Sequence, residues 1–129
     1  MKISDFLKED LEFNFAIEDF TKAVIESLRK RAERVYRKSG EPWDSRINEL
    51  EKQYLDSLQV DDLRNWVRFS YLPYKDQRRA LFFVLKSDTQ KFKAGDIFEP
   101  NMQQRPDTTR NPIANVLDPE SYLFMTPGY

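Results

Sequence analysis

The alternation of apolar and polar positions is most regular in the first half of the chain. Between residues 14 and 40, large apolar side chains recur every three or four residues, as on one face of an α-helix, and Gly40 supplies a stop. The residues of this face are Ile17, Phe20, Val24, Leu28 and Val35. The spacing predicts one long helix with a buried stripe.

Shorter helices are predicted on both sides of this one. A first helix over residues 4–12 has an N-cap residue and three apolar positions. Another opens at about residue 44 and carries a buried row as far as residue 58. A further short helix starts at Asp61 and ends at Pro73, because the proline ring clashes with a continuing helix.

The segment 76–98 fits two structures. Its run of six apolar residues at 80–85 suits either a buried strand or a helix that is buried all round. Asp76 as a cap and the helix-forming residues after it favour a helix. The fold class predicted is therefore mainly α, a small bundle of four to five helices with an extended, proline-punctuated C-terminal arm. The alternative is an α+β fold with a short hairpin at about 79–98, turning near Ser87 and Asp88.

Composition changes beyond residue 97. Five of the seven prolines fall in the last 32 residues, a density that forbids a long helix or a central strand. We therefore divide the chain into a helical body, 1–97, and an extended docking arm, 98–129.

The arm is richer in apolar residues than an ordinary disordered terminus. Eight large side chains lie within its last nineteen residues: Ile113, Val116, Leu117, Tyr122, Leu123, Phe124, Met125 and Tyr129. Such a segment should not fold alone but can order in a preformed groove. The groove belongs either to the same chain or to a neighbour, and the apolar rows already present in 1–97 favour a neighbour.

A basic segment lies at the end of the long predicted helix. Its six cations are Arg29, Lys30, Arg31, Arg34, Arg37 and Lys38. They resemble a helix face that contacts phosphates, which makes nucleic acid a candidate partner. The favoured interpretation is a solvated helix end, because cations there complement the helix dipole.

Composition argues against an enzyme. The chain has no Cys and no His, so zinc sites that use sulfur, imidazole ligands and Ser-His or Cys-His couples are excluded. Its three glycines form no phosphate-binding loop, and its adjacent acids diverge on a helix. We expect no catalytic residues, no cofactor and no metal. The 21 basic and 22 acidic residues nearly cancel, and acids interrupt the N-terminal segment, which favours the cytoplasm or a cytoplasmic particle over secretion or a membrane.

The sequence therefore favours a non-enzymatic assembly protein. Its arm would dock on an identical subunit or on another protein, as in a viral connector ring or a shell-associated component. The alternatives are a nucleic-acid-binding accessory protein that uses the basic helix and a small inhibitor that occludes a host protein.

Overall fold

Two helices precede a sheet in the computed structural model, which describes residues 11–38, 45–74 and 77–125; the side chains at 36–38, 45–48 and 74 lie outside the description. Helix α1 spans Leu11–Lys38 and helix α2 spans Ser45–Ser57. Both follow the predicted apolar spacing, but Val35, predicted on the buried face of the long helix, is 46% exposed. The first predicted helix, 4–12, falls almost entirely outside the described residues.

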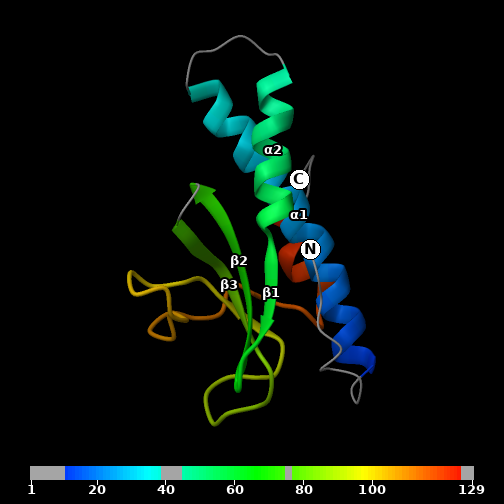
Figure 1. Cartoon of the computed structure of the whole chain (residues 1–129). Helices are drawn as coiled ribbons and strands as arrows, with labels where there is room; N and C mark the ends of the chain where they lie inside the picture. The colour runs from blue at the N-terminus through cyan, green and yellow to red at the C-terminus, as the bar shows by residue number, and fades with distance from the viewer. Residues whose placement is uncertain (1–10, 39–44, 75–76, 126–129) are drawn as a thin grey trace.

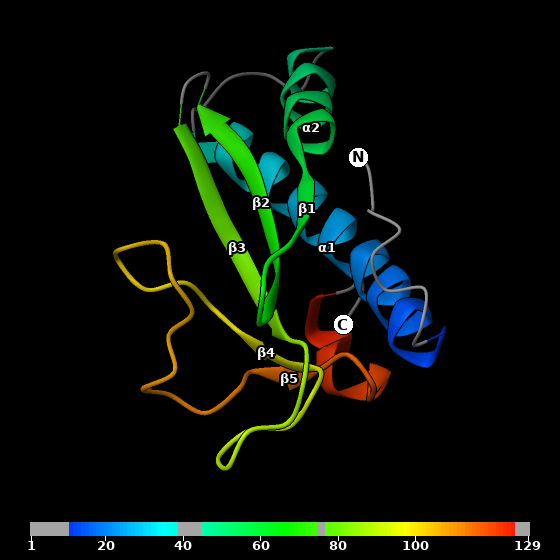
Figure 2. The same cartoon turned by 60° about the horizontal axis from the view of Figure 1, so that its bottom comes forward.

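The rest of the chain forms a five-stranded antiparallel sheet whose strands are adjacent in chain order. The strands are β1 (Gln59–Asp62), β2 (Trp66–Tyr74), β3 (Gln77–Leu85), β4 (Asp96–Phe98) and β5 (Ala114–Asn115). The 3-10 helix η2 (Pro119–Met125) follows. As Figures 1 and 2 show, α1 crosses one face of the sheet, and β2 and β3 extend well beyond the short strands β4 and β5.

The prediction of a mainly α bundle is wrong, and the α+β alternative is the correct class. The predicted helix from Asp61 to Pro73 is instead the end of β1, the connection 63–65 and most of β2. Aromatic and β-branched residues in WVRFSY favour a strand, and Pro73 lies near the end of β2, where a strand tolerates proline. The predicted helix over 76–98 is also wrong, because β3 and β4 pair there.

One row of small and medium side chains runs across four strands beneath α1. Val67 pairs with Val84, Val84 with Ile97, and Ile97 with Ala114. All four are buried. Cross-strand neighbours point to the same face of a sheet, so this row forms a continuous floor for the helix.

The ring of Phe20 lies at the centre of the core. It makes edge-to-face contacts with Phe69 of β2, Phe82 of β3 and Tyr122 of η2, with centroids 5.2, 5.5 and 5.2 Å away. Such pairs stabilise by about 0.5–1.5 kcal/mol beyond the area they bury. Phe20 therefore joins the first helix, the sheet and the last helix.

The opposite face of the sheet has its own aromatic cluster. Trp66 and Phe92 each pack edge-to-face on Phe98, and Trp66 also contacts Phe83. Phe92 comes from the loop 86–95, in which Thr89 Oγ1 accepts from Phe92 N and Asp88 Oδ1 accepts from Ala94 N. Both faces of β3 are thus buried, which explains its unbroken apolar run.

The C-terminal region belongs to the same sheet and core. The boundary drawn between residues 97 and 98 falls inside β4, and residues beyond it supply β5 and η2. Gly95 joins this region to β3: its N–H donates to Leu85 O, and its carbonyl accepts from Val116 N. With φ at +90° and Asn115 Oδ1 2.7 Å from the position of a Cβ, a side chain at Gly95 would be strained.

Two neighbours in η2 test whether the last helix supports the fold. Tyr122 is 5% exposed and Phe124 is 51% exposed. Tyr122→Ala should lower the free energy of unfolding by about 3 kcal/mol or more, as for other large aromatic residues in cores. Phe124→Ala should lower it by less than about 1 kcal/mol. Urea unfolding of both variants checks this, and equal losses would contradict the buried position of Tyr122.

The Tyr122 hydroxyl should make stability depend on alkaline pH. Burial, and then the charge of Asp19, raise the pKa of Tyr122 above its usual value of 10.0. The unfolded chain therefore loses this proton first, so stability should fall as the pH rises above about 10. Tyr122→Phe should lack this component. The check is the difference in unfolding free energy between wild type and Tyr122→Phe from about pH 8 to 11; a constant difference would contradict it.

Candidate functional site

A groove of about 520 Å³ lies between α1, the sheet and η2. Ser27, Lys30, Glu33 and Arg34 of α1 form one wall. Phe82 of β3, with Glu99 and Ile113 from the loop between β4 and β5, lies on the sheet side, and Phe124 and Met125 come from η2. The volume is in the range of sites that bind ligands or partner side chains.

Two elements place the groove residues. Along α1, positions 27, 30 and 34 share one face by helical spacing, beside the stripe that faces the sheet. In η2, the burial of Tyr122 against Phe20 places Met125 in the core and brings Phe124 to the groove. Ser121 supports the start of η2: its Oγ accepts from Asn115 N at 2.9 Å and donates to Asp118 O at 2.6 Å.

The groove has both signs of charge around an apolar centre. Arg34 and Glu99 are exposed and stand on its helix and sheet sides. Neither side chain has an ion pair within the part of the chain that the structure describes. Lys30 and Glu33 take part in other interactions of the chain. The groove can therefore bind an amphipathic surface, with polar contacts at its rim.

The predicted arm residues divide into two groups. Val116, Tyr122 and Met125 are buried in the core of their own chain, and Ile113 packs against that core. Leu117, Leu123 and Phe124 are exposed on the same chain. Tyr129 lies outside the described residues. Some apolar side chains of the arm are thus buried within the same chain, whereas Phe124 stays exposed at the groove.

The described cations of the predicted basic segment do not share one environment. The Nη1 of Arg31 donates to Tyr71 Oη at 2.9 Å, and its guanidinium lies 5.6 Å from the centroid of that ring. Arg29 pairs with Glu26 and, at 3.0 Å, with Glu51 of α2. Lys30 and Arg34 line the groove, and the side chains of Arg37 and Lys38 lie outside the description. The described cations therefore lie in three different environments: against Tyr71, beside Glu26 and Glu51, and on the groove wall.

A second cavity, of about 530 Å³, lies within the loop 99–113 and shares Glu99 and Ile113 with the groove. Asn101 Oδ1 accepts from the N–H groups of Gln103 and Arg105, and Gln104 Oε1 accepts from Ala80 N at 2.7 Å. Hydrogen bonds from Thr109 lower the pKa of Asp107. The polar contacts of this loop are made largely to its own backbone and to β3, which marks it as a cover for the sheet edge.

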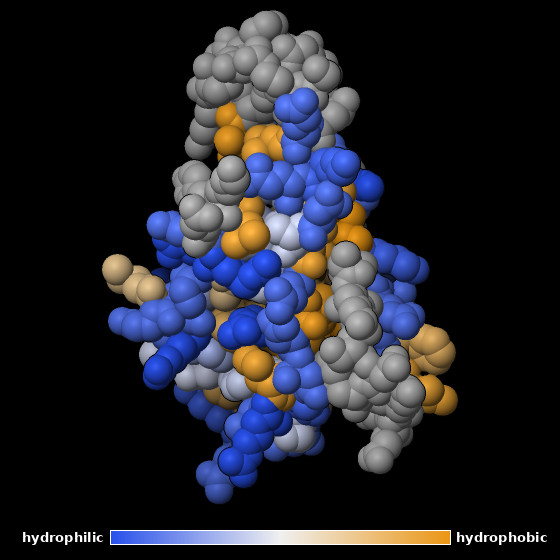
Figure 3. Space-filling model, viewed as in Figure 1, coloured by the Kyte–Doolittle hydropathy of each residue, from blue (hydrophilic) through white to orange (hydrophobic). Residues whose placement is uncertain are grey.

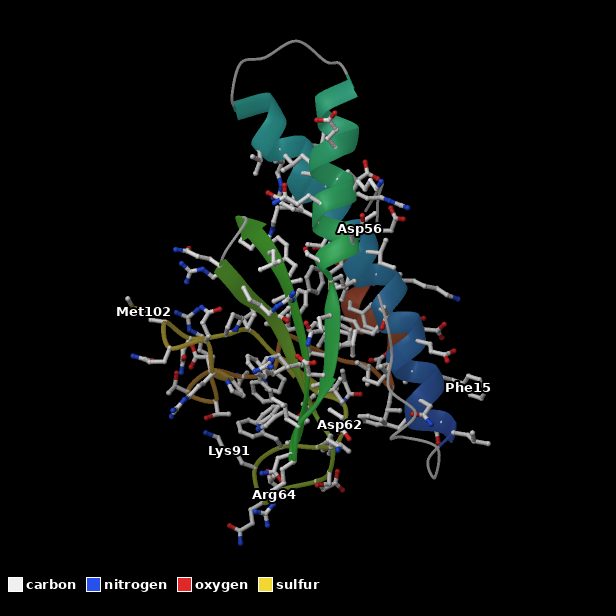
Figure 4. The ribbon with its side chains drawn as sticks, viewed as in Figure 1. Phe15, Asp56, Asp62, Arg64, Lys91 and Met102 are labelled. Atoms are coloured by element: carbon white, nitrogen blue, oxygen red, sulfur yellow. The ribbon has the colours of Figure 1, made fainter. Side chains whose placement is uncertain are left out.

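A further apolar pair is exposed at the start of α1. Leu11 and Phe15 are four residues apart and thus on one face of the helix. Figure 4 shows Phe15 pointing away from the body of the molecule, on the flank opposite Met102. In the matching view of Figure 3, most of the described surface is hydrophilic, and apolar atoms emerge on the flank where α1 begins.

Other site classes find no support among the described residues. No group of three or more Asp or Glu side chains gathers there as metal ligands. Neither α1 nor α2 is long and apolar enough to cross a membrane. Comparison of the chain with protein-family models, curated proteins and solved structures finds no match.

Sequence reasoning found the residue types of the groove but not the groove. It placed Lys30 and Arg34 in one candidate site and Ile113, Phe124 and Met125 in another. It did not single out Ser27, Glu33, Phe82 or Glu99 as site residues. The helical spacing of 27, 30 and 34 was the only available signal, and it does not identify what faces that wall.

A structural role for Arg31 predicts energetic coupling to Tyr71. Combining Arg31→Gln with Tyr71→Phe in a double-mutant cycle should give about 1 kcal/mol of coupling in urea unfolding, typical of one hydrogen bond. Arg34 lies on the groove wall, so the change in unfolding free energy caused by Arg34→Gln should simply add to that caused by Tyr71→Phe. Coupling as large for Arg34 as for Arg31 would contradict the assignment.

Proposed function

We propose that this chain is a non-catalytic component of a protein assembly and that it docks through the groove between α1, β3 and η2. The observation that supports the proposal is Phe124. This side chain remains 51% exposed beside Ile113 and Met125, although the neighbouring Tyr122 is buried. Full burial of an exposed Phe contributes about 1.5–3 kcal/mol, and a partner that covers the exposed half of Phe124 would gain roughly half of this.

The surroundings of Phe124 suit a protein partner. The groove combines an apolar centre with a charged rim, which is the usual arrangement of a protein interface. A specific interface buries about 1,000 Å² or more in total, so the contact would extend beyond the groove to neighbouring surfaces such as that of Leu123. A ring or shell-associated subunit is the finer form of this proposal and rests on analogy of general form alone.

Nucleic acid is the weaker candidate. Binding to phosphates needs cations that are available together on one surface. Arg31 is engaged with Tyr71, Arg29 with acidic side chains, and Arg78 donates to Ser57 O and Ser70 Oγ. These contacts favour the interpretation of the basic segment as part of the helix surface and its packing.

Substitution at Phe124 tests the docking surface in the complete chain. Truncation after residue 97 is unsuitable, because it would remove β5 and η2. Phe124→Ser should abolish the binding of protein partners while the chain stays folded. Met102→Ser is the matched control, because Met102 is 93% exposed on the loop 99–113 and does not line the groove.

The measurement has two stages. Tagged wild-type, Phe124→Ser and Met102→Ser chains first isolate partners from the source cells. Each captured protein is then purified and mixed with the chain at known concentrations for light scattering. A complex of defined stoichiometry should form with wild type and Met102→Ser only. Complexes of equal mass and affinity with Phe124→Ser would contradict the proposal.

A further inference from the structure

The two exposed charges of the groove come from different walls of it. Arg34 belongs to the α1 wall, and Glu99 follows β4 on the sheet side. Within the described residues, neither has an ion pair. Phe124, Ile113 and Met125 lie among the same lining residues. The surface thus has a cation, an apolar centre and an anion.

This charge pattern identifies the kind of partner. The lining residues include two cations, Lys30 and Arg34, and two anions, Glu33 and Glu99. A partner of one dominant sign would place a like charge against either Arg34 or Glu99, and such a contact is unfavourable. A surface with opposite charges on the two sides of an apolar centre complements a copy of itself after a two-fold rotation. The net charge of −1 also gives little overall repulsion between two copies.

We propose that the groove binds a second copy of this chain across a two-fold axis that passes through its mouth. The rotation exchanges the two sides, so Arg34 of each copy lies over Glu99 of the other, and the two Phe124 side chains approach each other at the centre. This inference rests on the proposed function and adds the identity of the partner. Apolar contact supplies most of the affinity, and the two exposed ion pairs add a smaller share and fix the orientation of the two copies.

Reciprocal charge reversal tests the arrangement. In a dimer of Arg34→Glu chains, both cross-contacts place two acidic side chains together; in a dimer of Glu99→Arg chains, both place two basic side chains together. Each variant alone should dimerise at least about tenfold more weakly than wild type, because juxtaposed like charges are costly. In an equimolar mixture, a dimer with one chain of each variant brings opposite charges together at both cross-contacts. Such mixed dimers should therefore form with near wild-type affinity.

Sedimentation velocity over a range of concentrations measures the dimers, and energy transfer between differently labelled variants identifies mixed ones. Arg64→Glu is the matched control: Arg64 is exposed, Figure 4 shows it at the end of the molecule near Lys91, and its reversal should leave dimerisation unchanged. If a reversed chain fails to fold, Arg34→Gln and Glu99→Gln replace the reversals. Each should weaken the wild-type dimer less than a reversal does, and unchanged affinity in both would overturn the inference.

Three other results would overturn this inference. They are a wild-type chain that stays monomeric at all concentrations, reversed variants that dimerise as well as wild type, and a mixture that associates no more than its components. A monomeric wild-type chain that binds another protein in a Phe124-dependent way would reject the second copy as partner and retain the proposed function. A chain that neither dimerises nor binds another protein in a Phe124-dependent way would reject the groove as a docking surface.

Discussion

Close packing around the ring of Phe20 holds the first helix, the sheet and η2 together. This ring contacts one aromatic side chain from each of β2, β3 and η2. These contacts bring residues 69, 82 and 122 to a single point on α1. Because the core around Phe20 is close-packed, the position of the sheet and that of the C-terminal helix are set together.

The groove follows from this arrangement. Burial of Tyr122 against Phe20 orients η2 so that Phe124 and Met125 line the groove beside the second half of α1. The strands β4 and β5 are only three and two residues long, so they cover only one end of the longer strands (Figure 2). A hollow therefore remains beside β3, and cations of α1 and apolar residues of the C-terminal region meet in it.

The two helices could be predicted from the sequence, and the sheet could be predicted only in part. Helices α1 and α2 have one buried stripe each, and such a stripe recurs with a period that local sequence reveals. Strand β3 is buried by α1 on one face and by the aromatic cluster on the other, so its run ALFFVL has no alternation. The segment of β2 is predicted as a helix because Asp61 suits an N-cap and Pro73 suits a helix end, although the residues WVRFSY favour a strand. In β3, tertiary burial outweighed the preference of its first residues for a helix.

Local sequence patterns reveal the residue types that a site could contain, the two helices and the surplus of apolar side chains near the C-terminus. They do not reveal that Val116, Tyr122 and Met125 complete the core of their own chain, whereas Phe124 lines a groove with Arg34 and Glu99; the packing of the whole fold sets this. The physical reason is that local periodicity records which side chains avoid water. It does not record which distant segment covers them, because that choice depends on how whole elements pack.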